Sequence, residues 1–176
     1  MENINVLIQR AQKGNKDAFG EIYKIYFKKI YRYCRINLER EETAKDLAQE
    51  TFLKAWRALP TFSTGNGGSI QAFLFRIARN LIIDLSRKKI DLPLDTALEV
   101  EAREDIEEQL DRKNDITLVQ KALSKLQEED KQIVILRFFE EMPTAQIAQV
   151  VGLSEGNLRV RLHRVLKKLK GMIYEK

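Results

Sequence analysis

Apolar residues recur at the three- and four-residue spacing of amphipathic helices along most of this 176-residue chain, and no segment alternates as a half-buried strand would. The first clear run begins at Phe19, just after Asn15 and Asp17, whose short polar side chains are typical N-caps. Further helices are expected at 42–59, 71–88, 118–126, 130–139, 144–151 and 154–174. Pro60 ends one of them, and the glycine-rich stretch 63–69 predicts a loop. The sequence therefore predicts an all-α fold.

The net charge of +5 is distributed unevenly along the chain. Residues 1–90 carry a net charge of +8, residues 91–115 carry −7, and residues 116–176 carry +4. The acidic stretch contains few large apolar side chains, which is the composition of a solvated connector. We therefore expect two small helical domains, at 1–90 and 116–176, joined by a flexible acidic linker at 91–115.

Composition excludes several classes of function. The chain has one cysteine, Cys34, and one histidine, His163, which are too few ligands for a zinc site and too few thiols for an internal disulfide. Neither of the usual glycine-rich phosphate-binding motifs occurs. No apolar stretch is long enough to cross a membrane, and the polar N-terminus differs from a signal peptide. We expect a cytoplasmic chain with no cofactor, no metal and no membrane insertion.

A helix-turn-helix pattern dominates the C-terminal part. Ala148 and Gly152 have the spacing of a small residue where two helices cross and a turn residue with positive φ, and Ser154 is the expected N-cap of the second helix. The side chains predicted to be buried on that helix are Leu158, Leu162, Val165, Leu166, Leu169 and Ile173. The opposite face and its flanks carry Arg159, Val160, Arg161, His163, Arg164 and Lys167. Such a face suits the major groove of DNA, although a merely solvated amphipathic helix has the same charge pattern.

Two strings in the N-terminal part carry a more specific resemblance. Asp46 to Trp56 reads D-L-A-Q-E-T-F-L-K-A-W, and Phe75 to Asp84 reads F-R-I-A-R-N-L-I-I-D. With the helix-turn-helix in the same order, they resemble regions 2 and 4 of bacterial RNA polymerase sigma factors of the extracytoplasmic-function (ECF) group. The resemblance implies a non-enzymatic protein that binds core RNA polymerase and directs transcription initiation at promoters with minus-ten and minus-thirty-five elements.

The resemblance also implies roles for particular residues. The residues implied to dock on the coiled coil of the polymerase β′ subunit are Asp46, Gln49, Glu50 and Lys54. Those implied to read and melt the minus-ten element are Ser63, Asn66, Phe73, Arg76, Asn80, Asp84 and Arg87. Those implied to read the minus-thirty-five element are Arg159, Val160, Arg161, His163, Arg164 and Lys167. Further implied partners are the β flap of the polymerase and an anti-sigma factor.

The chain departs from the family pattern at three places. The loop at 63–69 is longer than is usual, and Phe73 stands where tryptophan is common. Both bear on which minus-ten base is preferred, although the loop also fits a plain glycine-rich tip. Val160 stands where a small polar residue is common, so a methyl contact to thymine would replace a hydrogen bond.

The resemblance also implies a role for the acidic linker. It would thread the basic polymerase channel that later carries RNA.

The residues leave two alternatives open. A helix-turn-helix regulator that acts without polymerase explains the C-terminal part but leaves both N-terminal strings unexplained. A nucleic-acid enzyme with a carboxylate-bound metal would use Asp46, Glu50 or Asp84. Asp46 and Glu50 are like charges four residues apart on one helix, which is mildly unfavourable and indicates an external partner.

Overall fold

The computed structural model describes residues 3–91 and 121–174, and these residues form helices and loops with no strand. The N-terminal bundle consists of α1 (Ile4–Gln12), α2 (Lys16–Asn37), α3 (Glu41–Ala58) and α4 (Ile70–Asp91). The C-terminal bundle consists of α6 (Glu128–Val134), α7 (Thr144–Val151) and α8 (Glu155–Tyr174). Short 3-10 turns at Leu59–Thr61 and Gly65–Gly67 lie between α3 and α4, and a π-helix at Ile135–Phe139 continues α6. The all-α prediction is confirmed, and no described helix is long and apolar enough to span a bilayer.

Capping residues start the first two helices. The Asn15 side chain accepts a hydrogen bond from the Ala18 N–H at 2.9 Å, as predicted, and α2 begins immediately after it. Helix α1 was not expected from the sequence. It begins after Asn3, whose side chain accepts from the Asn5 N–H, and it buries Leu7, Ile8 and Ala11 against the bundle.

An aromatic cluster joins α2 to α3. Phe52 of α3 meets Tyr23 of α2 edge-on, with ring centroids 4.7 Å apart, and Trp56 lies 5.0 Å from Phe19. Cys34 is fully buried farther along α2, and burial raises the pKa of its thiol to about 12. The thiol is therefore protonated and unreactive at neutral pH.

The helix-turn-helix has the predicted turn. Gly152 has φ of 72° and its N–H donates to the Ala148 carbonyl at 2.9 Å, while Ser154 accepts from the Asn157 N–H. Leu158 and Val165 are buried in α8, and Leu162 and Leu169 are half-buried. The prediction for Leu166 was wrong: it is 37% exposed, because the partner helices cover only a narrow stripe of α8. The side chain of Ile173 lies outside the described part.

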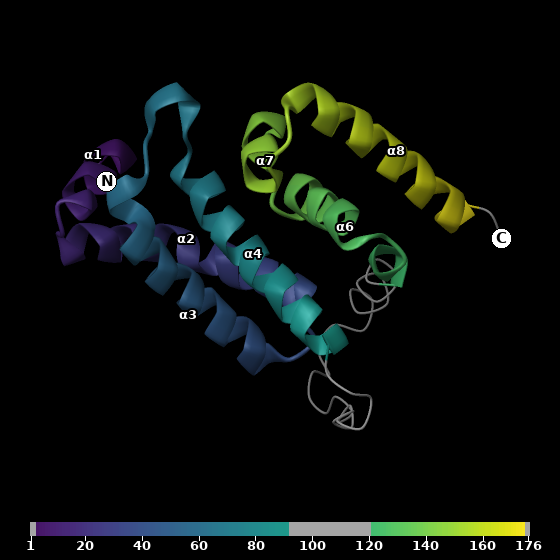
Figure 1. The fold of residues 1–176 in the computed structure, drawn as a ribbon, viewed down its shortest axis with the longest axis horizontal. Helices are drawn as coiled ribbons and strands as arrows, with labels where there is room; N and C mark the ends of the chain where they lie inside the picture. The colour runs from purple at the N-terminus through teal and green to yellow at the C-terminus, as the bar shows by residue number, and fades with distance from the viewer. Residues whose placement is uncertain (1–2, 92–120, 175–176) are drawn as a thin grey trace, which may run out of the picture.

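The two bundles pack against each other, and α4 runs between them (Figure 1). It contacts α2 and α3 on one side and α7 on the other. Leu74 and Ala78 are buried, and Ile77, Leu81 and Leu85 are half-buried. Phe75 and Ile82, which the sequence pattern did not single out, are also buried. A helix covered on two sides has a wider buried face than one amphipathic stripe predicts.

Polar contacts cross between the bundles. The Arg32 guanidinium of α2 makes a bidentate ion pair with Glu140, with nitrogen–oxygen distances of 2.9 and 2.7 Å. The buried Tyr33 hydroxyl donates to Gln132 of α6, whose amide donates in turn to Asn37 at 2.6 Å. Apart from Asp91, the linker predicted at 91–115 lies outside the described residues, so the exact bounds of the two domains and of the linker stay a prediction.

Candidate functional site

The outer face of α3 presents polar side chains. Asp46, Gln49 and Lys54 are exposed, and Glu50 is half-buried. Leu53, one residue before Lys54, is 54% exposed despite being apolar. The face therefore combines charges with an uncovered aliphatic side chain, which is the composition of a protein-binding surface.

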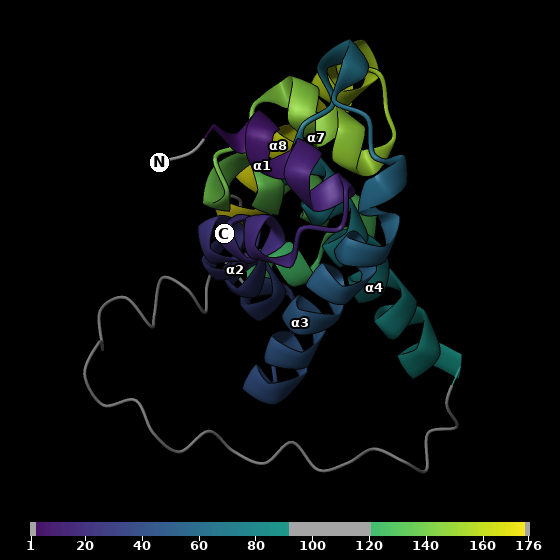
Figure 2. The same cartoon turned by 90° about the vertical axis from the view of Figure 1, so that its left-hand side faces the viewer.

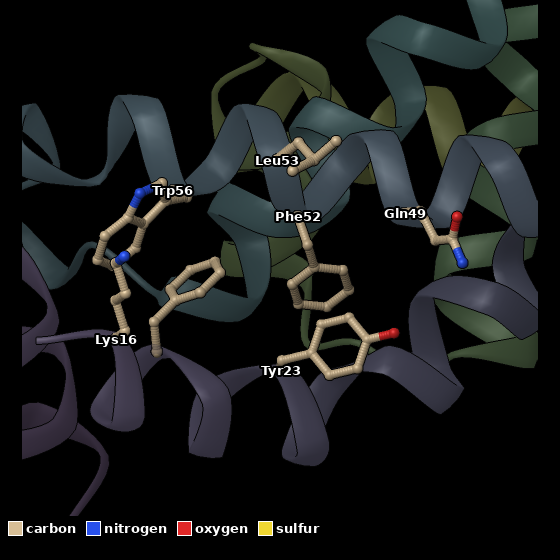
Figure 3. Close-up of a pocket in the computed structure, with 7 residues that line it drawn as sticks. Lys16, Tyr23, Gln49, Phe52, Leu53 and Trp56 are labelled. Carbon is tan, nitrogen blue, oxygen red and sulfur yellow. The ribbon is translucent and has the colours of Figure 1, made fainter.

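A groove borders this face between α2 and α3 (Figure 3). It has a volume of about 480 Å³. The lining residues are Lys16, Phe19, Tyr23, Gln49, Phe52, Leu53 and Trp56. Lys16 and Trp56 lie at one end and Gln49 at the other (Figure 3), so the floor is apolar and the rim is polar. Sequence reasoning missed the groove because its two walls come from different helices, although Leu53 beside Lys54 was a signal.

One stripe of α4 is exposed. Arg76, Asn80, Asp84 and Arg87 follow each other at four- and three-residue spacing, and all four side chains face solvent. Phe73, at the start of the helix, is half-buried against Phe62, with ring centroids 4.8 Å apart. The structure therefore aligns four of the predicted side chains on one stripe and packs the fifth, Phe73, against Phe62.

The loop at 63–69 has a defined shape. Gln12 of α1 fixes its base, donating from its side-chain amide to the carbonyls of Leu59 and Phe62 at 3.1 and 2.6 Å. Gly67 has φ of 79°, and a Cβ on Gly68 would collide with the Ser63 carbonyl oxygen. Ser63 is exposed at the loop, whereas the side chain of Asn66 lies outside the described part. Both glycines are therefore required by the backbone path.

The outer face of α8 is open to solvent. Val160 is 53% exposed, and the cationic and polar neighbours Arg159, His163, Arg164 and Lys167 are all exposed. Arg159 makes only a long contact with Glu155 of the same helix, at 3.5 Å. A shallow cavity of about 550 Å³ lies between this face and Asp130 of α6. The face can thus approach a polyanion with little rearrangement.

Arg161 differs from the other predicted contacts on α8. Its guanidinium is 2.7 Å from the Asp130 carboxylate and 2.8 Å from the Glu129 carboxylate, both on α6. Hydrogen bonding to Asp130, followed by that to Glu129, raises the pKa of Arg161 above its ordinary value. The side chain is therefore engaged in holding α8 against α6.

No group of three or more histidine, cysteine, aspartate or glutamate side chains with metal-binding geometry occurs in the described parts of the chain.

Sequence reasoning also missed Gln149, which reaches from α7 to the loop at 63–69. No local pattern marks it, because its partner is about eighty residues away along the chain.

Two family matches cover most of the sequence. Residues 22–90 match Sigma-70 region 2, and residues 116–169 match Sigma-70, region 4. Three surfaces fall within these two ranges: the outer face of α3, the exposed stripe of α4 with its loop, and the solvent face of α8. The groove between α2 and α3 reaches beyond them, because Lys16 and Phe19 precede residue 22.

Curated relatives are similar along nearly the whole chain. It is 33% identical over 172 residues to the ECF RNA polymerase sigma factor BldN of Streptomyces coelicolor, covering 95% of this chain and 64% of that protein. It is 31% identical over 172 residues to the ECF RNA polymerase sigma factor SigW of Bacillus subtilis, covering 89% of each. The chain thus spans about two thirds of BldN and most of SigW.

Solved structures share the fold. CnrH, in complex with the cytosolic domain of CnrY, has a TM-score of 0.73 and 26% identity, covering 96% of this chain and 95% of that one. The sigma factor RpoE from Bartonella quintana, in complex with the anti-sigma factor NepR, has a TM-score of 0.66 and 21% identity, covering 88% of this chain and 96% of that one. The second likeness is one of fold.

Proposed function

The chain belongs to the ECF group of RNA polymerase sigma factors and serves promoter-specific transcription initiation, and we propose that its N- and C-terminal bundles read the minus-ten and minus-thirty-five elements. One observation carries the proposal. A single chain presents a solvent-exposed cationic face on its helix-turn-helix and, in the other bundle, an exposed polar stripe beside a loop whose base is hydrogen-bonded to Gln12. A regulator acting alone needs only the first of these.

We assign polymerase docking to the outer face of α3. Asp46, Gln49, Glu50 and Lys54 would contact the coiled coil of the β′ subunit, and the exposed Leu53 beside them would add an apolar contact. An opposing cation would relieve the repulsion between Asp46 and Glu50. The C-terminal bundle would meet the β flap.

Helix α4 and its loop would read the minus-ten element as a single DNA strand, after the duplex has melted. Arg76 and Arg87 supply positive charge for the DNA backbone, while Asn80 and Asp84 offer hydrogen bonds to base edges. The loop at 63–69, with Ser63 and Asn66, would hold a flipped base. Phe73 would fix the angle between the loop and α4.

The minus-thirty-five element would lie in the major groove against α8. Arg159 and Arg164 have the reach for guanine O6 and N7, Val160 supplies methyl groups for thymine, and Lys167 would neutralise phosphate. His163 would add a further contact on this face. Arg161 would orient the helix through α6 and contribute little to readout.

The remaining partners follow from the same family. The acidic linker would cross the basic polymerase channel, and an anti-sigma factor would control access to the surfaces, as NepR pairs with RpoE of Bartonella quintana. The protein would act in the cytoplasm, where core polymerase is found, and would catalyse no chemical step itself.

Run-off transcription tests this function. Purified chain and core polymerase are mixed with a promoter library, and Asp46→Lys/Glu50→Lys is compared with the matched control Glu41→Lys/Glu42→Lys, whose sites are exposed at the N-terminal end of α3. We expect polymerase-dependent transcripts that only the first variant abolishes. DNA binding without polymerase dependence would favour a stand-alone regulator, and metal-dependent cleavage would favour an enzyme; either would overturn the proposal.

A further inference from the structure

Gln149 of α7 bridges two backbone groups of the loop at 63–69. Its side-chain Nε2 donates to the Gly67 carbonyl oxygen at 3.0 Å, and its Oε1 accepts from the Ser69 N–H at 3.4 Å. A carboxamide bound in this way offers an adjacent acceptor and donor. The Watson–Crick edge of every nucleobase offers an adjacent acceptor and donor too, so the side-chain amide of Gln149 has the same pair of hydrogen-bonding groups as the edge of an unpaired base.

We propose that this is a closed, inactive conformation in which Gln149 occupies the base-binding atoms of the loop, namely the Gly67 carbonyl and the Ser69 N–H. The ligand of these atoms in the open conformation is an unpaired base of single-stranded DNA. The inference rests on the proposed function, and it adds both the atoms that bind the base and the side chain that blocks them.

The loop also has contacts of its own within the N-terminal bundle. Gln12 of α1 holds the base of the loop, and the ring of Phe62 packs on Phe73. The positive φ of Gly67 and the close approach of Gly68 to Ser63 set the tip. Because these contacts lie within the N-terminal bundle, removing Gln149 leaves the donor and acceptor in place and uncovered.

A second group of contacts holds the closed conformation. Arg32 and Glu140 form a bidentate ion pair in which the carboxylate side chain is fully buried and the guanidinium is half exposed. Tyr33 and Asn37 of α2 bind Gln132 of α6: the Tyr33 hydroxyl donates to the Gln132 side-chain oxygen, and the Gln132 amide donates to the Asn37 side-chain oxygen. Closure is therefore specific and is not a chance contact between apolar faces.

The closed conformation is too short to read a promoter. The two elements lie about 25 base pairs apart, which at about 3.4 Å for each pair is about 85 Å of duplex. Here α7 lies directly on α4, in the same molecule whose α8 would read the other element (Figure 2). The bundles must separate before both elements are engaged.

Opening can follow polymerase docking. The α3 face, with Asp46 and Lys54, is exposed in the closed conformation, and α3 packs chiefly on α2 and α4. The polymerase can therefore bind the closed chain first. Separation of the bundles then withdraws Gln149 and frees the loop for the melted strand.

Binding of single-stranded DNA tests the inference. Wild-type, Gln149→Ala and Gln149→Glu chains of all 176 residues are titrated against a short, randomised oligonucleotide carrying fluorescein, with anisotropy as the readout. The matched control is Gln9→Ala, an exposed glutamine of α1. We expect both Gln149 variants to bind about tenfold more tightly than wild type if closure is favoured about ten to one, and the control to match wild type.

The ion pair supplies an independent variant. Arg32→Glu sets two carboxylates against each other and should raise affinity, whereas Arg32→Glu combined with Glu140→Arg restores the pair and should return affinity toward wild type. Circular dichroism of each variant verifies folding. Unchanged or weaker binding by Gln149→Ala would overturn the inference, whatever Arg32→Glu does.

Failure of the inference is distinguishable from failure of the proposed function. If no variant gains affinity but wild-type chain with core polymerase gives run-off transcripts, the loop is not blocked by Gln149 and the function stands. If transcripts are absent while Gln149→Ala gains affinity, the closed conformation stands and the polymerase role fails.

Discussion

The two DNA-facing surfaces of this chain differ in readiness. On α8 the exposed Val160 and its cationic neighbours face solvent, and within the described residues the Arg164 side chain makes no hydrogen bond or ion pair. In the N-terminal bundle, the backbone groups of Gly67 and Ser69 are already bound by Gln149. One surface is open in the free chain and the other is occupied.

The difference follows from what each surface reads. Duplex DNA exposes its major groove at all times, so a helix that reads it needs no protection. An unpaired base exists only after melting, and a loop with free donors and acceptors would bind single strands indiscriminately. Covering the loop until the polymerase is present confines strand capture to the promoter.

The largest expected effect separates the two surfaces. Arg164→Ala should weaken binding to duplex promoter DNA by about 1–3 kcal/mol with or without polymerase, because its guanidinium is exposed in both states. Asn80→Ala should weaken binding only with polymerase, when the strands separate. Anisotropy with promoter DNA selected by the holoenzyme measures both, and an equal loss for Asn80→Ala in the free chain would contradict the comparison.

A substitution in the turn of the helix-turn-helix should lower the stability of the C-terminal bundle only. Gly152→Val is expected to lower the free energy of unfolding of the C-terminal bundle by about 1–2 kcal/mol, since φ is 72° there. Space is not limiting, because no heavy atom lies within 4 Å of an added Cβ. Gly152→Asn, which tolerates this φ, should cost less in urea unfolding. Equal costs would mean that the turn is not what destabilises the variant.

Substitutions of Arg161 and Lys167, both on α8, should have different effects: the first on stability and the second on DNA binding. Arg161→Gln breaks the pairs with Asp130 and Glu129, and we expect it to lower stability by up to about 1 kcal/mol. Lys167→Gln should leave stability unchanged but reduce the salt dependence of DNA binding by about one phosphate. Thermal unfolding and binding at several salt concentrations distinguish them, and a reversed result would place Arg161 on the DNA.

The smallest expected effect is in the interior of the N-terminal bundle. Burial raises the pKa of Cys34 to about 12, so the reactive thiolate should be absent between pH 7 and about pH 9 in the folded chain. Iodoacetamide should label Cys34 only after unfolding. Rapid labelling of the native chain would contradict this prediction, because it would show that the N-terminal bundle itself opens as readily as the two bundles separate from each other.

Features encoded within a few residues were predictable from the sequence. Asn15 and Ser154 cap helices as expected, and Gly152 makes the turn of the helix-turn-helix. The exposed stripe of α4 also follows from helical spacing, since Arg76 and Asn80 share one face of a helix that buries Leu74 and Ala78. Local sequence fixes these because each depends on contacts within one or two helical turns.

Features that depend on distant partners were not predictable. Phe75 and Ile82 are buried in a helix covered on two sides by parts of the chain far apart in sequence. Arg161 fits the basic pattern of α8 yet pairs with two carboxylates of α6. Gln149 carries no local signal at all, because a glutamine on a helix is common and only the fold brings it to Gly67.

The distance between the bundles tests the central claim most directly. Spin labels would be attached at Lys28→Cys and Lys170→Cys, which are both exposed positions, while the buried Cys34 stays unlabelled. Pulsed electron–electron double resonance then measures the distance between the two labels. We expect a single narrow distribution in the free chain and a shift of more than about 30 Å with core polymerase, since the elements lie about 85 Å apart. A distribution that is already long in the free chain, or that does not change with polymerase, would contradict the account.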